Sequence, residues 1–264
     1  MRTYLFWLLF SSFSLFGQST RVIYNFKYKI TEKNYDSIRV VIDITKDSLI
    51  SYPEAFLTNK NYKPNSLITG AQVIIRKRGS HSNNTFFKDK NFMYCIKTED
   101  TVKWEIKDSI KVIDKLRLQE AQTDFGQRHW VAWFDPNFIY GEGPYKFSGL
   151  PGIIYQIEDT EKEYKFSLQE IRQIPGKASY SFLNEYIGNK VIKINWDKFN
   201  NILFKYYQDP YSLRGRDPLD GVESLKIDGQ EIKTRQEFDN VIKERRKKIK
   251  EVFDMFIEKD KIKI

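Results

Sequence analysis

The chain is poor in the residue types that most often build reactive sites. Among its 264 residues there are one cysteine, two histidines and three methionines. A single cysteine excludes an internal disulfide, so the fold must be held together by its core. The same scarcity makes a poor case for a thiolate and thioether copper(I) site. Cys95 lies in an apolar, strand-like stretch, residues 92–96, which favours a buried, unreactive thiol over a reactive or intermolecularly paired one.

The sequence also lacks the short motifs of common catalytic sites. Neither a Gly-x-Ser-x-Gly nucleophile elbow nor a His-Glu-x-x-His zinc motif occurs. His81 sits among turn residues, and His129 stands beside Trp130 in a predicted strand. We therefore predict two independent structural histidines and assign no catalytic, cofactor-binding or metal-binding residue. The alternative that remains open is a hydrolase or metal-binding site in which His129 joins carboxylates of the central region, namely Asp124, Asp135, Glu142, Glu158 and Asp159.

Long apolar runs are missing except at the N-terminus. Residues 4–10 are apolar, Arg2 precedes them and serines interrupt the pattern after them. A bilayer span needs about 20 predominantly apolar residues, so the pattern is typical of a cleaved signal peptide rather than of a membrane anchor. We predict a signal peptide over residues 1–17, ending at Gly17, and one domain over residues 18–264 without a transmembrane helix. The residue directly after Gly17 is not a cysteine, so lipid attachment by the bacterial lipoprotein route has no acceptor.

The excess of positive charge is mild. The chain has 44 basic and 35 acidic residues and a formal net charge of +9. Nucleic-acid binding requires that such charge gather in one patch or on a recognisable fold, and neither is apparent. We expect a solvated surface and no nucleic-acid partner. Aromatic residues make up 16% of the chain and supply a large apolar core.

Alternation of apolar and polar residues is the dominant pattern. It is clearest at residues 24–30, 38–44 and 102–106, where it predicts antiparallel strands with one face in water. The continuous apolar runs of parallel sheets are missing. Residues 51–70 predict a connection with at most a short helix, and the turn residues within 76–84 predict a hairpin.

Helical patterns appear late in the chain. Residues 196–207 carry an apolar stripe with Asp197 as the predicted N-cap. The stripe over residues 238–257 begins at a capping box formed by Thr234 and Glu237. The basic residues 245–248 interrupt it, and we interpret them as a solvated face rather than an anionic-lipid site. We predict a mainly β (α+β) fold: one antiparallel, twisted or partly closed sheet covered by these two helices, the second of them C-terminal.

The most distinctive segment lies in the middle of the chain. Residues 150–153 predict a type II turn, because Pro151 presets φ at the second position and Gly152 accepts a positive φ at the third. Ile153, Tyr155 and Ile157 then predict one face of a strand. A turn at residues 159–162 leads to a return strand with apolar residues at 164, 166 and 168.

These residues resemble the GLPGLI family, secreted proteins found mainly in Bacteroidetes. The family motif corresponds to Gly149, Leu150, Pro151, Gly152, Ile153 and Ile154. An upstream stretch matches with one residue inserted, through Gly126, Arg128, Trp130, Ala132 and Trp133. Further matches are Trp104 and the approach to the motif, Gly143, Pro144, Tyr145, Lys146 and Phe147. The chain departs from the family at Leu118 and Glu120, where the family commonly has a cysteine and a lysine.

The resemblance implies a location but no chemistry. It implies the periplasm, outer-membrane surface or exterior of a Gram-negative cell. The family has no established activity, so no residue inherits a catalytic role. We expect an exported, non-enzymatic binding or structural module, in which the motif residues are structural and the sheet, in the manner of a lipid-carrier half-barrel, holds an apolar ligand or contacts an envelope protein.

Overall fold

The computed structural model describes residues 19–30, 33–59, 61–62, 72–89, 92–175, 178–213, 215–254 and 256–263. The predicted signal peptide lies outside the described residues. Fourteen strands and four α-helices follow in chain order. The strands are β1 (Ser19–Lys29), β2 (Tyr35–Ile44), β3 (Ser48–Pro53), β4 (Val73–Lys77), β5 (Ser82–Asp89), β6 (Phe92–Glu99), β7 (Glu105–Ile113), β8 (Leu116–Phe125), β9 (Arg128–Asp135), β10 (Ile153–Asp159), β11 (Tyr164–Ile174), β12 (Val191–Ile194), β13 (Leu225–Ile227) and β14 (Gln230–Ile232). The helices are α1 (Ala55–Thr58), α2 (Ser181–Ile187), α3 (Trp196–Gln208) and α4 (Arg235–Asp254).

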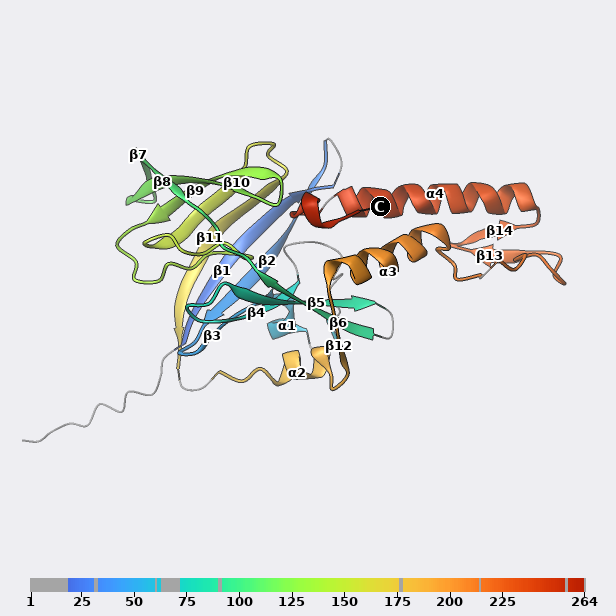
Figure 1. The fold of residues 1–264 in the computed structure, drawn as a ribbon, viewed down its shortest axis with the longest axis horizontal. Coiled ribbons are helices and arrows are strands. Elements are labelled where there is room, and N and C mark those ends of the chain that lie inside the picture. The colour runs from blue at the N-terminus through green and yellow to red at the C-terminus, as the bar shows by residue number, and fades with distance from the viewer. Residues whose placement is uncertain are drawn as a thin grey trace, which may run out of the picture.

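Twelve of the strands form one strongly curved sheet (Figure 1) in the order β12-β6-β5-β4-β3-β2-β1-β11-β10-β9-β8-β7. The mainly β prediction is confirmed. The prediction of a single, wholly antiparallel sheet is wrong, because β12 pairs parallel with β6, and β13 and β14 form a separate small sheet. A parallel pair requires a crossover connection, and here the connection from β6 to β12 includes β7 to β11 and then α2.

The centre of the sheet is buried on both faces. On one face Tyr24 and Phe26 belong to the largest apolar core. On the other, Ile23 and Val41 pack with residues of α1 and α2. The expectation of strands with one face in water is therefore wrong at the centre. The cause is α2, which sequence periodicity did not predict although Gly188, with φ of 70°, directly follows it.

Other predicted strands fit in part. Residues 24–29 and 38–44 lie in β1 and β2 as predicted, and residues 76–84 form the β4–β5 hairpin. The pattern at 102–106 is displaced, because β7 begins only at Glu105. Residues 51–53 belong to β3 instead of a connection, and the short helix expected after them is α1.

The two predicted late helices are α3 and α4, which lie side by side and carry β13 and β14 at their far end (Figure 1). The capping box is confirmed: the Glu237 N–H donates to Thr234 Oγ1 at 3.2 Å, and the Thr234 N–H to Glu237 Oε2 at 3.0 Å. The N-cap of α3 is Asn195 rather than Asp197, because the Asn195 side chain accepts the Lys198 N–H.

The basic cluster at 245–248 divides between structure and solvent. Arg246 donates to the carbonyl oxygens of Tyr207 and Gln208 at the end of α3, and Arg245 donates to Tyr206 Oη. The next two residues, Lys247 and Lys248, are exposed, as a solvated face requires. Within the described part of the chain, no helix is both long and apolar enough to cross a membrane.

Candidate functional site

The upstream stretch that resembles the family begins with a tight turn at Gly126. The C-terminal segment, residues 256–263, packs against this turn. Gly126 and Gln127 join β8 to β9 with φ of 63° and 58°, the two positive values that a type I′ hairpin turn requires. A Cβ on Gly126 would lie 2.7 Å from Glu258 Cα, so only glycine fits. The Gly126 carbonyl accepts the Lys259 N–H at 3.0 Å. The inserted residue, Gln127, is thus part of the turn itself.

Arg128 forms a buried ionic cluster beside this turn. Its Nη1 donates to Asp159 Oδ2 and Glu163 Oε2, both at 2.7 Å, and its Nε to the Ile257 carbonyl at 3.2 Å. The guanidinium carbon also stands 4.4 Å from the centre of the Tyr164 ring. Arg128 therefore holds the β10–β11 turn and the C-terminal segment to one strand.

The two carboxylates respond differently to Arg128. Burial raises the pKa of Asp159 above its ordinary value, although two backbone N–H groups and Arg128 oppose that rise. Burial also acts to raise the pKa of Glu163, but Arg128 and Lys259 outweigh it and hold that pKa below its ordinary value. The difference follows from depth, since the Asp159 side chain is fully buried and that of Glu163 is half-buried.

Three carboxylates in this cluster have the spacing of metal ligands. Oxygen atoms of Asp159, Glu161 and Glu163 lie within 4.8 Å of one another, the one such group among the described residues. Arg128 contacts all three, and Lys259 Nζ lies 2.7 Å from Glu161. Lys29 Nζ also lies 3.4 Å from Glu163 Oε1. Since three protein cations already contact the three carboxylates, we interpret the group as an ion-pair cluster.

The approach to the motif builds a second buried ionic cluster. The Lys146 side chain is 0% exposed, and its Nζ lies 2.7 Å from Glu258 Oε1 and 3.2 Å from Asp100 Oδ2. Tyr145 Oη donates to the same Glu258 carboxylate. Burial raises the pKa of Tyr145 well above its ordinary value, so the phenol stays protonated. Tyr145 and Lys146, which the sequence matched to the family without assigning them a contact, therefore hold Glu258 in place.

The six-residue motif itself is held in place by close packing and does not form the predicted turn. Gly149 has the positive φ, 96°, whereas Gly152 does not, so the type II turn prediction is wrong. A Cβ on Gly152 would lie 2.0 Å from the Asp135 carbonyl oxygen. Glycine is needed there because β9 and β10 approach so closely. Leu150, Ile153 and Ile154 are all buried in the main core.

The strand after the motif is irregular. The pairing of β10 with β9 shifts between Ile154 and Gln156, which leaves Tyr155 as the extra residue of a β-bulge. Ile153 and Ile157 are buried, whereas Tyr155 turns its hydroxyl to Asp114. The prediction that Tyr155 shares their face is wrong. The turn at residues 159–162 is confirmed, with the Lys162 N–H donating to the Asp159 carbonyl.

The motif tryptophans lie in different environments. Trp130 is fully buried, packs edge-on against Phe147 at 4.8 Å and donates from Nε1 to the Phe125 carbonyl. Trp133 is half-buried, with Lys111 Nζ 5.5 Å from its ring centre. Trp104 donates to the Ser148 carbonyl at 2.9 Å. Two tryptophans thus anchor the segment around the motif to the core.

Gly143 and Pro144 shape the loop before the motif. A Cβ on Gly143 would lie 2.5 Å from Ile154 Cδ1, which makes glycine necessary. The Phe147 N–H donates to the Pro144 carbonyl and closes a turn. Next to this loop the guanidinium of the buried Arg76 pairs with Glu142 and donates to Ser148 Oγ at 2.9 Å.

The histidine alternative has little geometric support. His129 is 43% exposed, and its Nδ1 lies 2.8 Å from Oδ1 of the exposed Asp124. Within the described residues, no second carboxylate contacts His129. The remaining predicted carboxylates have partners elsewhere: Asp135 with Asn137, Glu142 with Arg76, Glu158 with Lys165, and Asp159 with Arg128.

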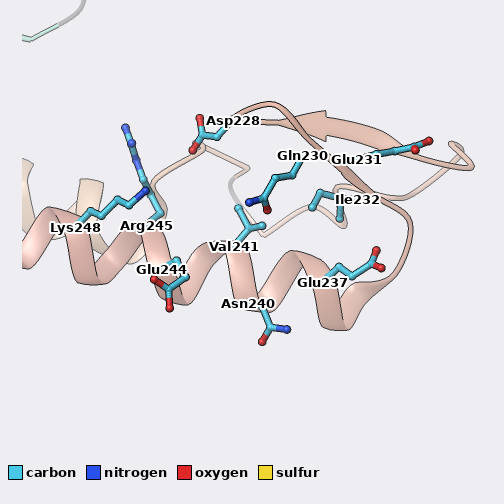
Figure 2. A pocket seen from close by; sticks show the side chains of 10 residues that line it. All are labelled: Asp228, Gln230, Glu231, Ile232, Glu237, Asn240, Val241, Glu244, Arg245 and Lys248. Atoms are coloured by element: carbon cyan, nitrogen blue, oxygen red, sulfur yellow. The ribbon is translucent and has the colours of Figure 1, made fainter.

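Two open hollows lie away from the motif. One, of about 630 Å³, is lined by residues of α1 and α2, among them Phe56 and Tyr186. The other, of about 490 Å³, lies between α4 and the β13–β14 hairpin. Figure 2 shows Val241 of α4 facing Gln230 and Ile232 of the hairpin, while Asn240 points away. Its lining is mostly polar and mixes both signs of charge, so it indicates no ligand class.

Cys95 is buried and free, as predicted. Its Sγ lies 3.8 Å from Asn84 Oδ1. Burial raises the pKa of the thiol, and the thiolate is the reactive form. This environment indicates a packing role.

The fold and the motif geometry define a β-rich protein with a curved sheet (Figure 1) whose main core includes side chains of its own central loop. No family model matches the chain, and no curated protein sequence does. The solved structures of PNGF-II, in space groups P21 and C2, are each similar at a TM-score of 0.53 and 12% identity, over 71% of this chain and 33% of that one. A domain of an outer membrane lipoprotein-sorting protein from Vibrio parahaemolyticus matches at a TM-score of 0.32 and 8% identity, over 65% of this chain and 92% of that one.

The similarity to PNGF-II bears on the fold alone. The chain spans about one third of the length of PNGF-II, and the low identity carries no residue of that protein over to this chain.

Proposed function

We propose that the chain is an exported envelope or secreted protein that binds a protein partner and catalyses no reaction. The predicted signal peptide and the resemblance of residues 126–154 to the GLPGLI family support export. The contacts of the motif support a structural role for it, because its side chains hold strands, turns and the C-terminal segment together. Binding must then take place elsewhere on the surface.

One observation carries the proposal: apolar side chains are exposed on an edge strand. Ile106, Ile110 and Val112 of β7, here called the apolar lip, are 45%, 47% and 66% exposed. β7 is the last strand of the sheet and pairs with β8 only. Its register places Ile106 opposite Ala121, and opposite residues share a face of the sheet. The apolar lip therefore lies on the face that carries the main core.

An edge strand with apolar side chains suits strand addition. The free edge offers backbone N–H and C=O groups to an extended peptide, and the exposed side chains add specificity. Lys107 and Lys111, together with the break in register between Ile106 and Ile110, are devices that keep such an edge from unselective pairing. The proposed partner is a protein segment that is extended and carries apolar residues.

An apolar small ligand in the curve of the sheet is less well supported. Trp130, Phe147 and Leu150 of the chain itself fill the core on that face. A ligand would have to displace them. The hydrolase alternative is weaker still, since His129 is exposed and contacts a single carboxylate.

A site-specific photo-cross-linking residue at Val112 tests the proposal. In the envelope fraction or culture medium of the native host, Val112 should give a discrete protein adduct, and Ile110→Asp should abolish it. The matched control is Val222, which is 49% exposed in the loop before β13. No adduct at Val112, or the same adducts at both positions, would contradict the proposal. Recovery of the chain from those fractions tests export at the same time.

A further inference from the structure

The cluster around Lys146 holds an amine against two carboxyl groups in the interior. The Lys146, Asp100 and Glu258 side chains are 0%, 7% and 2% exposed. The Lys146 Nζ stands one hydrogen bond from each carboxyl group. Two carboxyl groups therefore contact one buried amine. Lys261 also interacts electrostatically with both carboxyl groups, but its Nζ pairs with Asp260 at 2.7 Å.

This arrangement has the parts that amide formation requires. Amine and carboxyl are held in contact, which replaces a bimolecular encounter by an intramolecular step. Condensation consumes the neutral amine and the neutral carboxylic acid. The product amide also removes two charges from the interior, where an ion pair has a desolvation cost.

We propose that Lys146 and Asp100 condense to an intramolecular amide cross-link, with Glu258 carrying the proton. Asp100 is the acyl group because its Oδ2 accepts from Asn83 Nδ2 at 3.0 Å and from the Thr98 hydroxyl. Such donors stabilise the negative charge that develops on oxygen during attack.

Glu258 is placed for proton transfer. Its Oε1 lies 2.7 Å from Lys146 Nζ, within the range for a general base. The same carboxylate accepts the Tyr145 hydroxyl, which fixes its position. Its own role therefore differs from that of Asp100, although both touch the amine.

The step balances without a further reactant. A proton passes from the Lys146 ammonium to the Asp100 carboxylate, which gives the amine and the carboxylic acid. Nζ attacks Asp100 Cγ and the N–C bond forms. Glu258 takes a proton from nitrogen and returns it to the departing hydroxyl, so that the C–O bond breaks and one water leaves. Glu258 ends as it began.

The cross-link would join two parts of the chain that no disulfide can join. Asp100 follows β6, whereas Lys146 belongs to the loop between β9 and β10. A covalent tie here would fix the motif loop to the other half of the sheet. In a chain with one cysteine, it would serve the purpose of the missing disulfide.

Peptide mapping of the purified full chain tests the proposal. After denaturation and trypsin digestion, mass spectrometry should find a branched peptide that joins the segments containing Asp100 and Lys146. Its mass should be lower than the sum of the two linear peptides by one water, and no cleavage should occur after Lys146. Recovery of both segments as linear peptides only, or a branch from Lys146 to Glu258, would overturn the proposal. Since the wild-type chain decides this, no variant has to fold.

A pair of variants tests the role of Glu258. Glu258→Gln keeps the size of the side chain but cannot take up the proton, and we expect the branched peptide to fall at least about tenfold, in line with the loss of a general base. Glu161→Gln alters the neighbouring Arg128 cluster and should leave the branched peptide unchanged. Full cross-linking of Glu258→Gln would overturn the role of Glu258 as proton carrier.

Discussion

The core around Arg128 and Lys146, here called the motif core, and the helical arm use charged residues in opposite ways. In the motif core, Arg128 and Lys146 are buried and each contacts several acceptors. In the arm formed by α3, α4, β13 and β14, ion pairs such as that of Arg235 with Asp239 are exposed. Water can replace a lost partner in the arm but not in the core. The comparison indicates that the buried charges of the motif core contribute more to stability than the exposed charges of the arm.

The largest difference should come from removing one arginine in each region. Arg128→Ala leaves the Asp159 carboxylate buried without its main cation, which costs about 3–5 kcal/mol in the free energy of unfolding. Arg235→Ala removes an exposed pair and should cost less than about 1 kcal/mol. Urea unfolding followed by circular dichroism measures both. Equal losses of unfolding free energy in the two variants would show that the Arg128 cluster is accessible to water.

A smaller difference should separate two glycines. Gly152→Ala puts a methyl group against the Asp135 carbonyl, 2.0 Å away, and overpacking of this kind costs about 1–3 kcal/mol or more. Gly79 has φ of 70° in the β4–β5 turn with open space around it, so Gly79→Ala should cost only the backbone strain, about 1 kcal/mol. Thermal and urea unfolding of the two variants compare the cost of steric overlap at Gly152 with the cost of backbone strain at Gly79. A milder effect at Gly152 would mean that β9 and β10 can separate.

The smallest effect should be a pH dependence in the arm. Hydrogen bonds from the Lys233 and Thr234 N–H groups lower the pKa of Glu237 below its ordinary 4.5. A lowered pKa in the folded state gives stability that is present above pH 4.5 and is lost as the pH falls through the folded value. The difference in Tm between wild type and Glu237→Ala should therefore shrink from about pH 6 to about pH 3.

The matched control for that experiment is Glu237→Gln. An amide oxygen can still accept from the backbone of a capping box but does not titrate. Its difference in Tm from Glu237→Ala should stay constant over the same range of pH. A difference that changes with pH would place the titrating group elsewhere.

Local patterns in the sequence predicted local structure well. Alternation at residues 38–44 and the Thr234 capping box depend on neighbours along the chain, and both are in the structure. The N-cap of α3 was misplaced because Asn195 and Asp197 are both good capping residues. The bulge at Tyr155 has no signal of its own, since it arises from how β10 pairs with β9.

The contacts that assemble the candidate site could not be predicted, because they join distant residues. Gly126 and Arg128 were identified by resemblance, but nothing in the sequence connects them to Ile257 and Glu258. Lys146 and Asp100 look like two of many surface charges. Only the fold shows that both side chains are buried. Burial against each other is what distinguishes this pair from ordinary surface charges and makes the proposed amide formation conceivable.

The long reach of these contacts also sets an order of events. β1 pairs with β11, so the middle of the sheet cannot close before residue 174 is available. Arg128 and Lys146 can complete their contacts only when Ile257 and Glu258, which are close to the last described residues, are available. Until those residues arrive, the interior holds cations without all of their acceptors and Gly126 has nothing to pack against. A growing chain is therefore open to unfolding and to proteases until residues 257 and 258 have been added and have formed these contacts.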